Sequence, residues 1–164
     1  MEDCTFCQIY EEKKKVKYED EHFFIQFDAY PVTAGHLEII PKRHIESVFQ
    51  LSEAEWKQLQ QTLKKAKKLV KDADLKGIYE DFIAEPLDQN SEKFSREIID
   101  KGNWREGRPD AFNIGINEGR EAGRTIDHLH IHLIPRYEGD VQNPIGGVRN
   151  IIPEKADYKS RDTK

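Results

Sequence analysis

The sequence predicts an α+β fold, because strand-like stretches lie before and after one long amphipathic helix. A capping box, Ser52 with Glu55 three residues later, marks the start of this helix of about five turns. Its apolar stripe is Trp56, Leu59, Leu63, Ala66, Leu69 and Val70. The strand-like stretches, which make a sheet of about five strands, are residues 17–19, 22–27, 36–40, 111–117 and 127–134.

The stretches between these elements predict turns and a short helix. Residues 4–10 predict a short helical turn, and Asp20-Glu21 predicts a tight turn between the first two strands. The strand at 36–40 is expected to stop at Pro41, because proline lacks the amide donor that a ladder needs.

The second half of the chain is less regular. Residues 74–110 are expected to form an insertion, with a second helix at 91–101 and a loop in which Trp104 packs the insertion onto the domain; the alternative is that Trp104 stacks on a base or phosphate. From about residue 139 the chain is expected to be an extended tail. Because no internal repeat or linker is evident, residues 1–164 are expected to form a single domain.

Three histidines in strict alternation make residues 127–134 the candidate site. A strand sends successive side chains to opposite faces, so His128, His130 and His132 are expected to share one face. The intervening apolar residues then face the core. An imidazole can act as nucleophile, acid, base or metal ligand near neutral pH, so this face is expected to be functional. Just before it, a turn rich in small residues brings amides and the Thr125 hydroxyl within reach of an anion.

Composition limits the possible functions. The 164 residues carry a formal net charge of −5, which argues against a general nucleic-acid binder. No apolar run approaches the length of a membrane span, and Met1 is followed at once by polar residues, so a cytoplasmic protein is expected. In a reducing compartment, the spacing of Cys4 and Cys7 indicates metal ligands or a redox pair.

The motifs together resemble the histidine triad (HIT) hydrolases. Residues 128–134 match the family signature of three alternating histidines followed by apolar residues. Residues 27–44 resemble the family's N-terminal half, and residues 113–125 resemble its approach to the triad. The resemblance implies an antiparallel sheet of about five strands with packed helices, and a homodimer whose sheets join across the interface.

The resemblance also implies a reaction, which is cleavage of a nucleotide at its α-phosphate. His130 is then the nucleophile that forms a nucleotidyl-histidine intermediate, which water hydrolyses. A neutral imidazole is nucleophilic at pH 7, and its phosphoramidate hydrolyses easily, so one difficult step becomes two easier ones. The expected catalytic group is His130 with His128, His132 and His36, and the expected substrate-binding group is Asp28, Asn117, Gly123, Arg124 and Thr125.

Some members of the family bind zinc, and the matching residues here are Cys4, Cys7, His44 and His128. Two cysteines and two histidines make a closed, structural tetrahedral site. The resemblance therefore implies a structural Zn²⁺ ion that ties the N-terminus to the histidine strand; the alternative is a pair of free buried cysteines.

Several functions remain open. The substrate is expected to be a dinucleoside polyphosphate, with a nucleoside phosphoramidate as the alternative. A nucleotidyltransferase or phosphorylase is a second possibility, although many of these carry Gln in place of the third histidine. A non-catalytic nucleotide-binding scaffold is the third. Arg124 stands where many members have Gln, so it either adds charge beside the phosphates or pairs with an acid such as Glu121.

Overall fold

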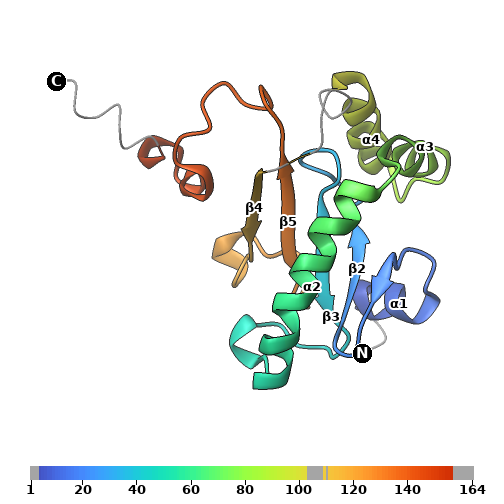
Figure 1. The fold of residues 1–164 in the computed structure, drawn as a ribbon, viewed down its shortest axis with the longest axis vertical. Helices are drawn as coiled ribbons and strands as arrows, with labels where there is room; N and C mark the ends of the chain where they lie inside the picture. Colours follow the sequence, from blue (N-terminus) through green and yellow to red (C-terminus); the bar gives the residue numbers. More distant parts are fainter. Residues whose placement is uncertain (1–3, 103–108, 110, 157–164) are drawn as a thin grey trace.

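The computed structural model describes residues 4–102, 109 and 111–156, and its core is one antiparallel sheet (Figure 1). The sheet has five strands in the order β1-β2-β3-β5-β4, which confirms the predicted number. Neighbouring strands are antiparallel throughout. The strands are β1 (Tyr18–Glu19), β2 (Phe23–Phe27), β3 (Leu37–Pro41), β4 (Ala111–Gly115) and β5 (Ile131–Arg136).

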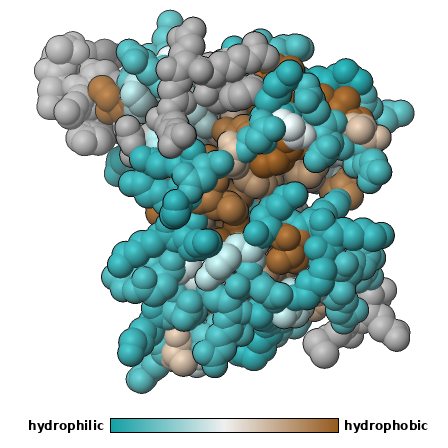
Figure 2. Space-filling model, turned by 45° about the vertical axis from the view of Figure 1, so that its right-hand side comes forward, coloured by the Kyte–Doolittle hydropathy of each residue, from teal (hydrophilic) through white to brown (hydrophobic). Residues whose placement is uncertain are grey.

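Four α-helices accompany the sheet in the described part of the chain. They are α1 (Thr5–Glu12), α2 (Glu53–Asp72), α3 (Leu75–Ala84) and α4 (Gln89–Lys101). Helix α2 crosses one face of the sheet, and α3 and α4 lie together beside its end (Figure 1). Among the described residues, no helix combines the length and apolar character needed to cross a bilayer. The face drawn in Figure 2 is mostly hydrophilic, with apolar side chains gathered mainly in a hollow across its middle.

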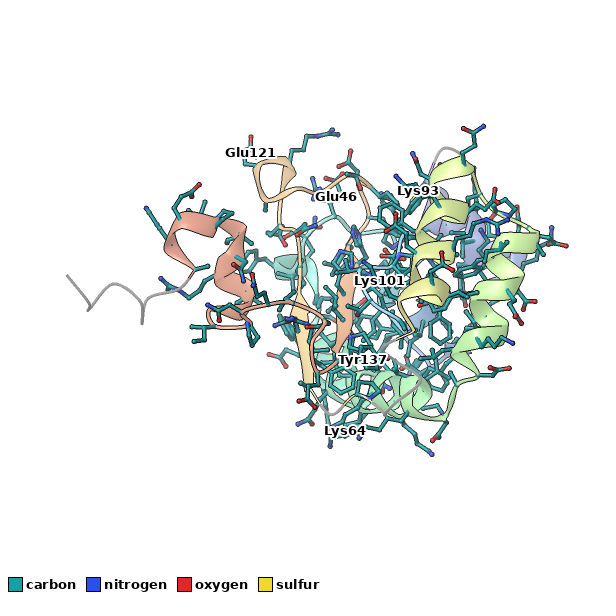
Figure 3. All side chains as sticks on the ribbon, turned by 90° about the horizontal axis from the view of Figure 1, so that it is seen from above. Glu46, Lys64, Lys93, Lys101, Glu121 and Tyr137 are labelled. Carbon is teal, nitrogen blue, oxygen red and sulfur yellow. The ribbon has the colours of Figure 1, made fainter. Side chains whose placement is uncertain are left out.

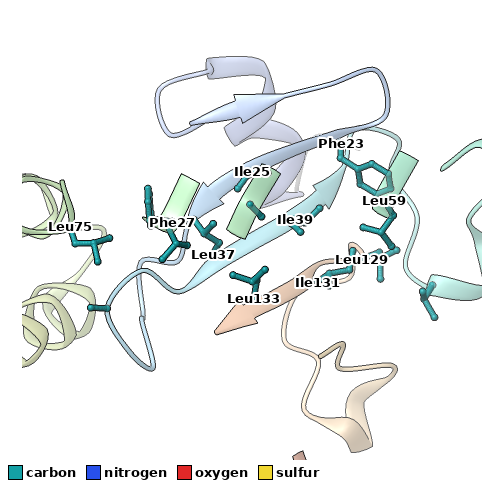
Figure 4. Close-up of a cluster of buried hydrophobic side chains, with 14 of the residues drawn as sticks. Phe23, Ile25, Phe27, Leu37, Ile39, Leu59, Leu75, Leu129, Ile131 and Leu133 are labelled. Atoms are coloured by element: carbon teal, nitrogen blue, oxygen red, sulfur yellow. The ribbon is translucent and has the colours of Figure 1, made fainter. Parts of the chain in front are cut away.

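The main core lies between α2 and the sheet, as the alternation in the strands predicts. Leu129, Ile131 and Leu133 are almost fully buried in it, beside alternate residues of β2 and β3 (Figure 4). The opposite face of the sheet is covered by α1, where Phe6 packs with Phe24 and Ile40. The sheet therefore presents its histidine face on the side away from α2.

The start of α2 confirms the predicted capping box but corrects the predicted stripe. Ser52 and Glu55 exchange the two expected hydrogen bonds. Trp56 is half exposed, and Glu55 takes the buried position instead. A charged residue can be buried there because the Arg43 guanidinium donates to both oxygens of its carboxylate.

The histidine stretch is shorter as a strand than predicted, because β5 begins only at Ile131. Its ladder with β3 ends at the Ile39–Ile131 pair, and continuing it would set Pro41, which has no amide donor, opposite Leu129. The preceding residues still run beside the chain that follows β3, since the amide of Leu129 donates to the carbonyl of Ile45 at 2.6 Å. The apolar residues of this stretch still face the core, and the histidines still lie on the other side, as predicted.

The insertion and the tail differ most from expectation. Helix α3 was not predicted, and α4 begins at Gln89 with Asp88 as its cap rather than at Ser91. The tail is not simply extended, because it forms two short 3-10 helices, Gly147–Ile151 and Pro153–Lys155. Trp104 lies outside the described residues.

Candidate active site and metal centre

The histidine face brings together two groups of side chains that meet at the triad. His130 and His132 have ring centroids 4.9 Å apart, and the ring of His132 lies 5.1 Å from that of His36. On the other side, the ring of His128 lies 4.8 Å from that of His44. Five of the six histidines of the chain therefore gather in one place.

The backbone fixes the tautomer of the central histidine. His130 is 6% exposed, and its Nδ1 lies 2.8 Å from the carbonyl oxygen of His128. A carbonyl accepts only, so Nδ1 carries the hydrogen and Nε2 keeps its lone pair. Phe6 packs against the ring, with centroids 5.2 Å apart, and holds its plane. The ring therefore has a fixed orientation, and Nε2 has the free lone pair that a nucleophile needs.

The third histidine is hydrogen-bonded to His36, whose Nδ1 accepts a hydrogen bond from the amide of Val32 and lies beside the carboxylate of Asp28. His132 Nδ1 lies 3.0 Å from His36 Nε2, and His36 Nδ1 lies 3.2 Å from a carboxylate oxygen of Asp28. Burial lowers the pKa of His132 to about 4 and also lowers that of His36. Both imidazoles are therefore neutral at pH 7, and each is held in place by the next.

The N-terminal cysteines join two histidines in a compact cluster. Cys4 Sγ lies 3.4 Å and Cys7 Sγ 3.7 Å from His128 Nδ1, and Cys7 Sγ lies 3.5 Å from His44 Nδ1. All four ligand atoms lie within 4.8 Å of one another. Two sulfurs and two nitrogens are the ligand atoms that a structural zinc site uses.

His128 is oriented for the cluster by a hydrogen bond at its other nitrogen. Its Nε2 lies 2.8 Å from the carbonyl oxygen of Pro41, so Nε2 carries the hydrogen and Nδ1 faces the sulfurs as a lone pair. Burial lowers the pKa of this imidazole to about 4. Burial, followed by the neighbouring Cys4, raises the pKa of the Cys7 thiol to about 11.

The turn before the triad places only part of the expected substrate-binding group together. A Cβ at Gly123 would lie 3.8 Å from Asn117 Nδ2, and the φ of +94° at this position favours glycine. Thr125 is exposed in the same turn. Asn117 and His132 both line a cavity that is described below.

Arg124 turns away from that group. Its guanidinium donates to the carbonyl and the carboxylate of Glu46, at 2.9 and 3.2 Å, and its Nε lies 3.3 Å from Asp127. Figure 3 shows Glu46 beside the turn and Glu121 at its outer tip. The acids that hold Arg124 are therefore Glu46 and Asp127 rather than Glu121, and its side chain is 13% exposed.

A cavity of about 800 Å³ opens beside His132. Its walls come from β4, from β5 and from the tail, including Asn113, Arg136 and Val148. Of the triad, His132 lines this space, and so do Val32 and Thr33 from the loop that follows Asp28. A group bound at His132 thus has room beside it for a second, bulky part.

Residues of α3 and α4 form hydrogen bonds with the loop that carries Asp28 and His36. The sequence did not predict these contacts. Tyr79 of α3 is fully buried, and its hydroxyl accepts a hydrogen bond of 2.7 Å from the amide of Gly35. At the N-terminus of α4, Asp88 accepts a hydrogen bond of 2.8 Å from the hydroxyl of Tyr30. A tyrosine in an unpredicted helix gave no sequence signal for this contact.

We expect Tyr79→Phe to lower the free energy of unfolding by about 2 kcal/mol, because it leaves the buried Gly35 amide without an acceptor. For a chain of this size, thermal unfolding should then shift down by about 4–8 °C. Tyr30→Phe removes an exposed hydrogen bond and serves as the matched control, with a shift of under about 2 °C. Equal shifts in melting temperature in the two variants would contradict a structural role for the hydrogen bond between Gly35 and Tyr79.

Comparison with known proteins agrees with this geometry. The HIT domain family model matches residues 10–139. The chain is 32% identical over 151 residues to an uncharacterised HIT-like protein of Methanocaldococcus jannaschii, and the match covers 90% of this chain and 91% of the relative. The protein therefore belongs to the HIT family.

Some relatives have a named activity. The chain is 25% identical over 150 residues to an AP-4-A phosphorylase of Mycobacterium tuberculosis, covering 90% of this chain and 60% of that protein.

Solved structures share the fold. A HIT family protein from Bacillus anthracis matches with a TM-score of 0.57 and 27% identity, covering 84% of this chain and 76% of that one. A zinc-bound histidine triad family protein from Mycobacterium smegmatis matches with a TM-score of 0.55 and 24% identity, covering 87% of this chain and 81% of that one. The open five-stranded sheet with packed helices is thus the α+β fold of this family.

Proposed function

We propose that the protein is a nucleotide hydrolase that cleaves its substrate at the α-phosphate through a nucleotidyl-His130 intermediate. The observation that carries this proposal is the hydrogen bond from His130 Nδ1 to the carbonyl of His128, which leaves the lone pair of Nε2 free. Membership of a family that includes an AP-4-A phosphorylase supports nucleotide chemistry.

In the first step His130 Nε2 attacks the α-phosphorus, and the bond from phosphorus to the leaving group breaks with its electron pair. In the second step water attacks phosphorus, the bond from phosphorus to Nε2 breaks, and one proton passes to solvent. His132, Asn117, Thr125 and the amide of Gly123 donate hydrogen bonds to the phosphate oxygens. Asp28 accepts hydrogen bonds from the ribose hydroxyls, and its contact with His36 fixes His132 in turn.

The cavity beside His132 supports a dinucleoside polyphosphate as substrate. Its 800 Å³ lies beside His132, and a nucleoside polyphosphate leaving group needs such space while a small amine does not. Incubation with diadenosine polyphosphate and with an adenosine phosphoramidate, followed by product analysis, tests this. Faster release of AMP from the phosphoramidate would favour a phosphoramidase, and products that retain added phosphate would indicate a phosphorylase.

We propose further that Cys4, Cys7, His44 and His128 hold a structural zinc ion. Zinc bonds of about 2.3 Å to sulfur and 2.0 Å to nitrogen place two ligand atoms roughly 3.6 Å apart at the tetrahedral angle. The sulfur-to-nitrogen distances of 3.4, 3.5 and 3.7 Å fit this value. Bound there, zinc supplies a cross-link between α1 and the triad stretch and takes no part in the reaction.

The organisation that we propose is one HIT domain with an insertion around 74–110, which assembles as a homodimer in the cytoplasm. Strand β4 is the edge of the sheet, and Ile114 on it is 49% exposed, so the edge is open to a second copy. A reducing compartment keeps the cysteine ligands available for metal. Light scattering at micromolar concentration distinguishes the dimer from a monomer.

The ion pairs of Arg124 with Glu46 and Asp127 support the alternative in which Arg124 pairs with acids and joins two loops, rather than contacting phosphate. We expect Arg124→Gln to lower kcat/KM for a diadenosine polyphosphate and for an adenosine phosphoramidate by the same factor, within about threefold. The free energy of unfolding should fall by about 1 kcal/mol, measured by thermal unfolding. A loss of tenfold or more confined to the polyphosphate would instead place the guanidinium on the phosphates.

A further inference from the structure

The tail that follows β5 builds one wall of the cavity beside His132. It leaves the sheet after Arg136 and turns back beside β4 (Figure 1). Its two ends pack together, because a Cβ at Gly146 would lie 2.3 Å from the carbonyl oxygen of Ala156, and Gly146 has a φ of +94°. The match to the HIT domain ends at residue 139, so this wall is an extension of the chain beyond the shared domain.

The cavity follows the histidine face of the sheet away from the triad. His132, Ile134 and Arg136 alternate along β5, and the register sets Asn113 of β4 opposite Ile134. The distance from His132 to Arg136 is about 13 Å at the usual rise of a strand. The volume of about 800 Å³ suits a small organic ligand, and the cavity begins at a histidine that the proposed reaction sets beside the phosphate.

The charges that line this cavity cancel. Among the described residues of its lining, Arg136 and Asp140 carry the only full charges. The guanidinium of Arg136 donates from Nε and Nη2 to the two carboxylate oxygens of Asp140, at 2.6 and 2.8 Å. His132 is neutral at pH 7, because burial lowers its pKa to about 4. A terminal phosphate that entered this cavity would therefore lose water without gaining a free cation.

The rest of the lining suits an uncharged ring with polar edges. Val148 and Ile151 of the tail line the cavity while 59% and 84% exposed, so their apolar surface is open to a ligand. Arg136 Nη1 donates to Asn113 Oδ1 at 2.6 Å, which fixes the orientation of that amide. Within the described part of the chain, the Nδ2 hydrogens of Asn113 then stay available for an acceptor on a ligand.

We propose that this cavity binds the second nucleoside of a dinucleoside polyphosphate, with the base against the tail and the amide of Asn113. This inference rests on the proposed function and names the part of the leaving group that is recognised. The phosphates stay beside the triad, and the uncharged base enters the neutral cavity. The tail thus favours a leaving group that ends in a nucleoside over one that ends in a phosphate.

The test compares kcat/KM for diadenosine tetraphosphate and adenosine 5′-tetraphosphate, which have equal numbers of phosphates and differ in the second nucleoside. We expect the wild-type protein to prefer the first by at least about tenfold. Val148→Ser combined with Ile151→Ser should reduce this preference at least about fivefold, because it removes apolar contact with the base and adds no charge. Ile152→Ser is the matched control, since Ile152 is 48% exposed in the same tail but lies outside the cavity lining, and it should leave the preference unchanged.

Asn113→Ala provides a second variant that leaves the tail intact, and it should reduce the same preference at least about threefold. Equal kcat/KM for the two substrates in the wild-type protein, or equal losses in the tail variant and in Ile152→Ser, would overturn the inference. Light scattering accompanies each variant. A loss of preference that coincides with dissociation into monomers would also overturn it, because the cavity would then be an interface between copies.

Calorimetric binding of the same two nucleotides separates these outcomes from failure of the proposed function. Tighter binding of diadenosine tetraphosphate that the tail variant weakens, without any hydrolysis, would keep the inference and refute the hydrolase. Hydrolysis of both nucleotides with equal kcat/KM would do the reverse.

Discussion

Replacing His130 with alanine should lower kcat for nucleotide hydrolysis at least about 10³-fold, because the substitution removes the nitrogen that forms the covalent intermediate. Nucleotide binding should persist within about tenfold, since the ribose and phosphate contacts come from other side chains. Product release under saturating substrate measures the first effect, and calorimetry with AMP measures the second.

His22→Ala is the matched control, because His22 is the histidine that lies outside the cluster on the triad face. It should leave both kcat and binding unchanged. Turnover by His130→Ala within tenfold of the wild-type rate would show that another group carries the reaction.

Removal of the metal ligands should have the largest effect on stability. Cys4→Ser, Cys7→Ser and His44→Ala should each reduce zinc from about one ion per chain and lower the melting temperature by about 10 °C, because the binding energy of a structural zinc ion is also folding energy. Elemental analysis of protein purified without added metal, with thermal unfolding in parallel, measures the two changes.

A strong chelator should reproduce the loss in the wild-type protein, while His22→Ala keeps its metal. Wild-type protein without metal, with a melting temperature that chelator does not change, would show that the two cysteines are simply free thiols.

The sequence predicted those features that depend on local periodicity. Alternation alone placed Leu129, Ile131 and Leu133 in the core and the three histidines on the opposite face. The capping box of Ser52 and Glu55 located the start of α2, because both hydrogen bonds join residues three apart.

The features that it missed depend on pairs far apart in the chain. Arg124 meets Glu46 across 78 residues, and Tyr79 meets Gly35 across 44. Local spacing carries no information on such pairs. The sequence does show one polar residue inside each of two otherwise apolar strands, Gln26 and Glu38. Only the register of β2 and β3 shows that these two side chains pair.

His128 belongs to two sites at once, and this has a mechanical consequence. Its ring faces the cysteines, while its main-chain carbonyl accepts the hydrogen of His130. The two sites thus share a single residue, so a rotation of its ring or a tilt of its peptide plane is felt in both. In the proposed function, a zinc ion that orders the cysteine cluster would therefore also restrict the peptide plane that holds the His130 ring.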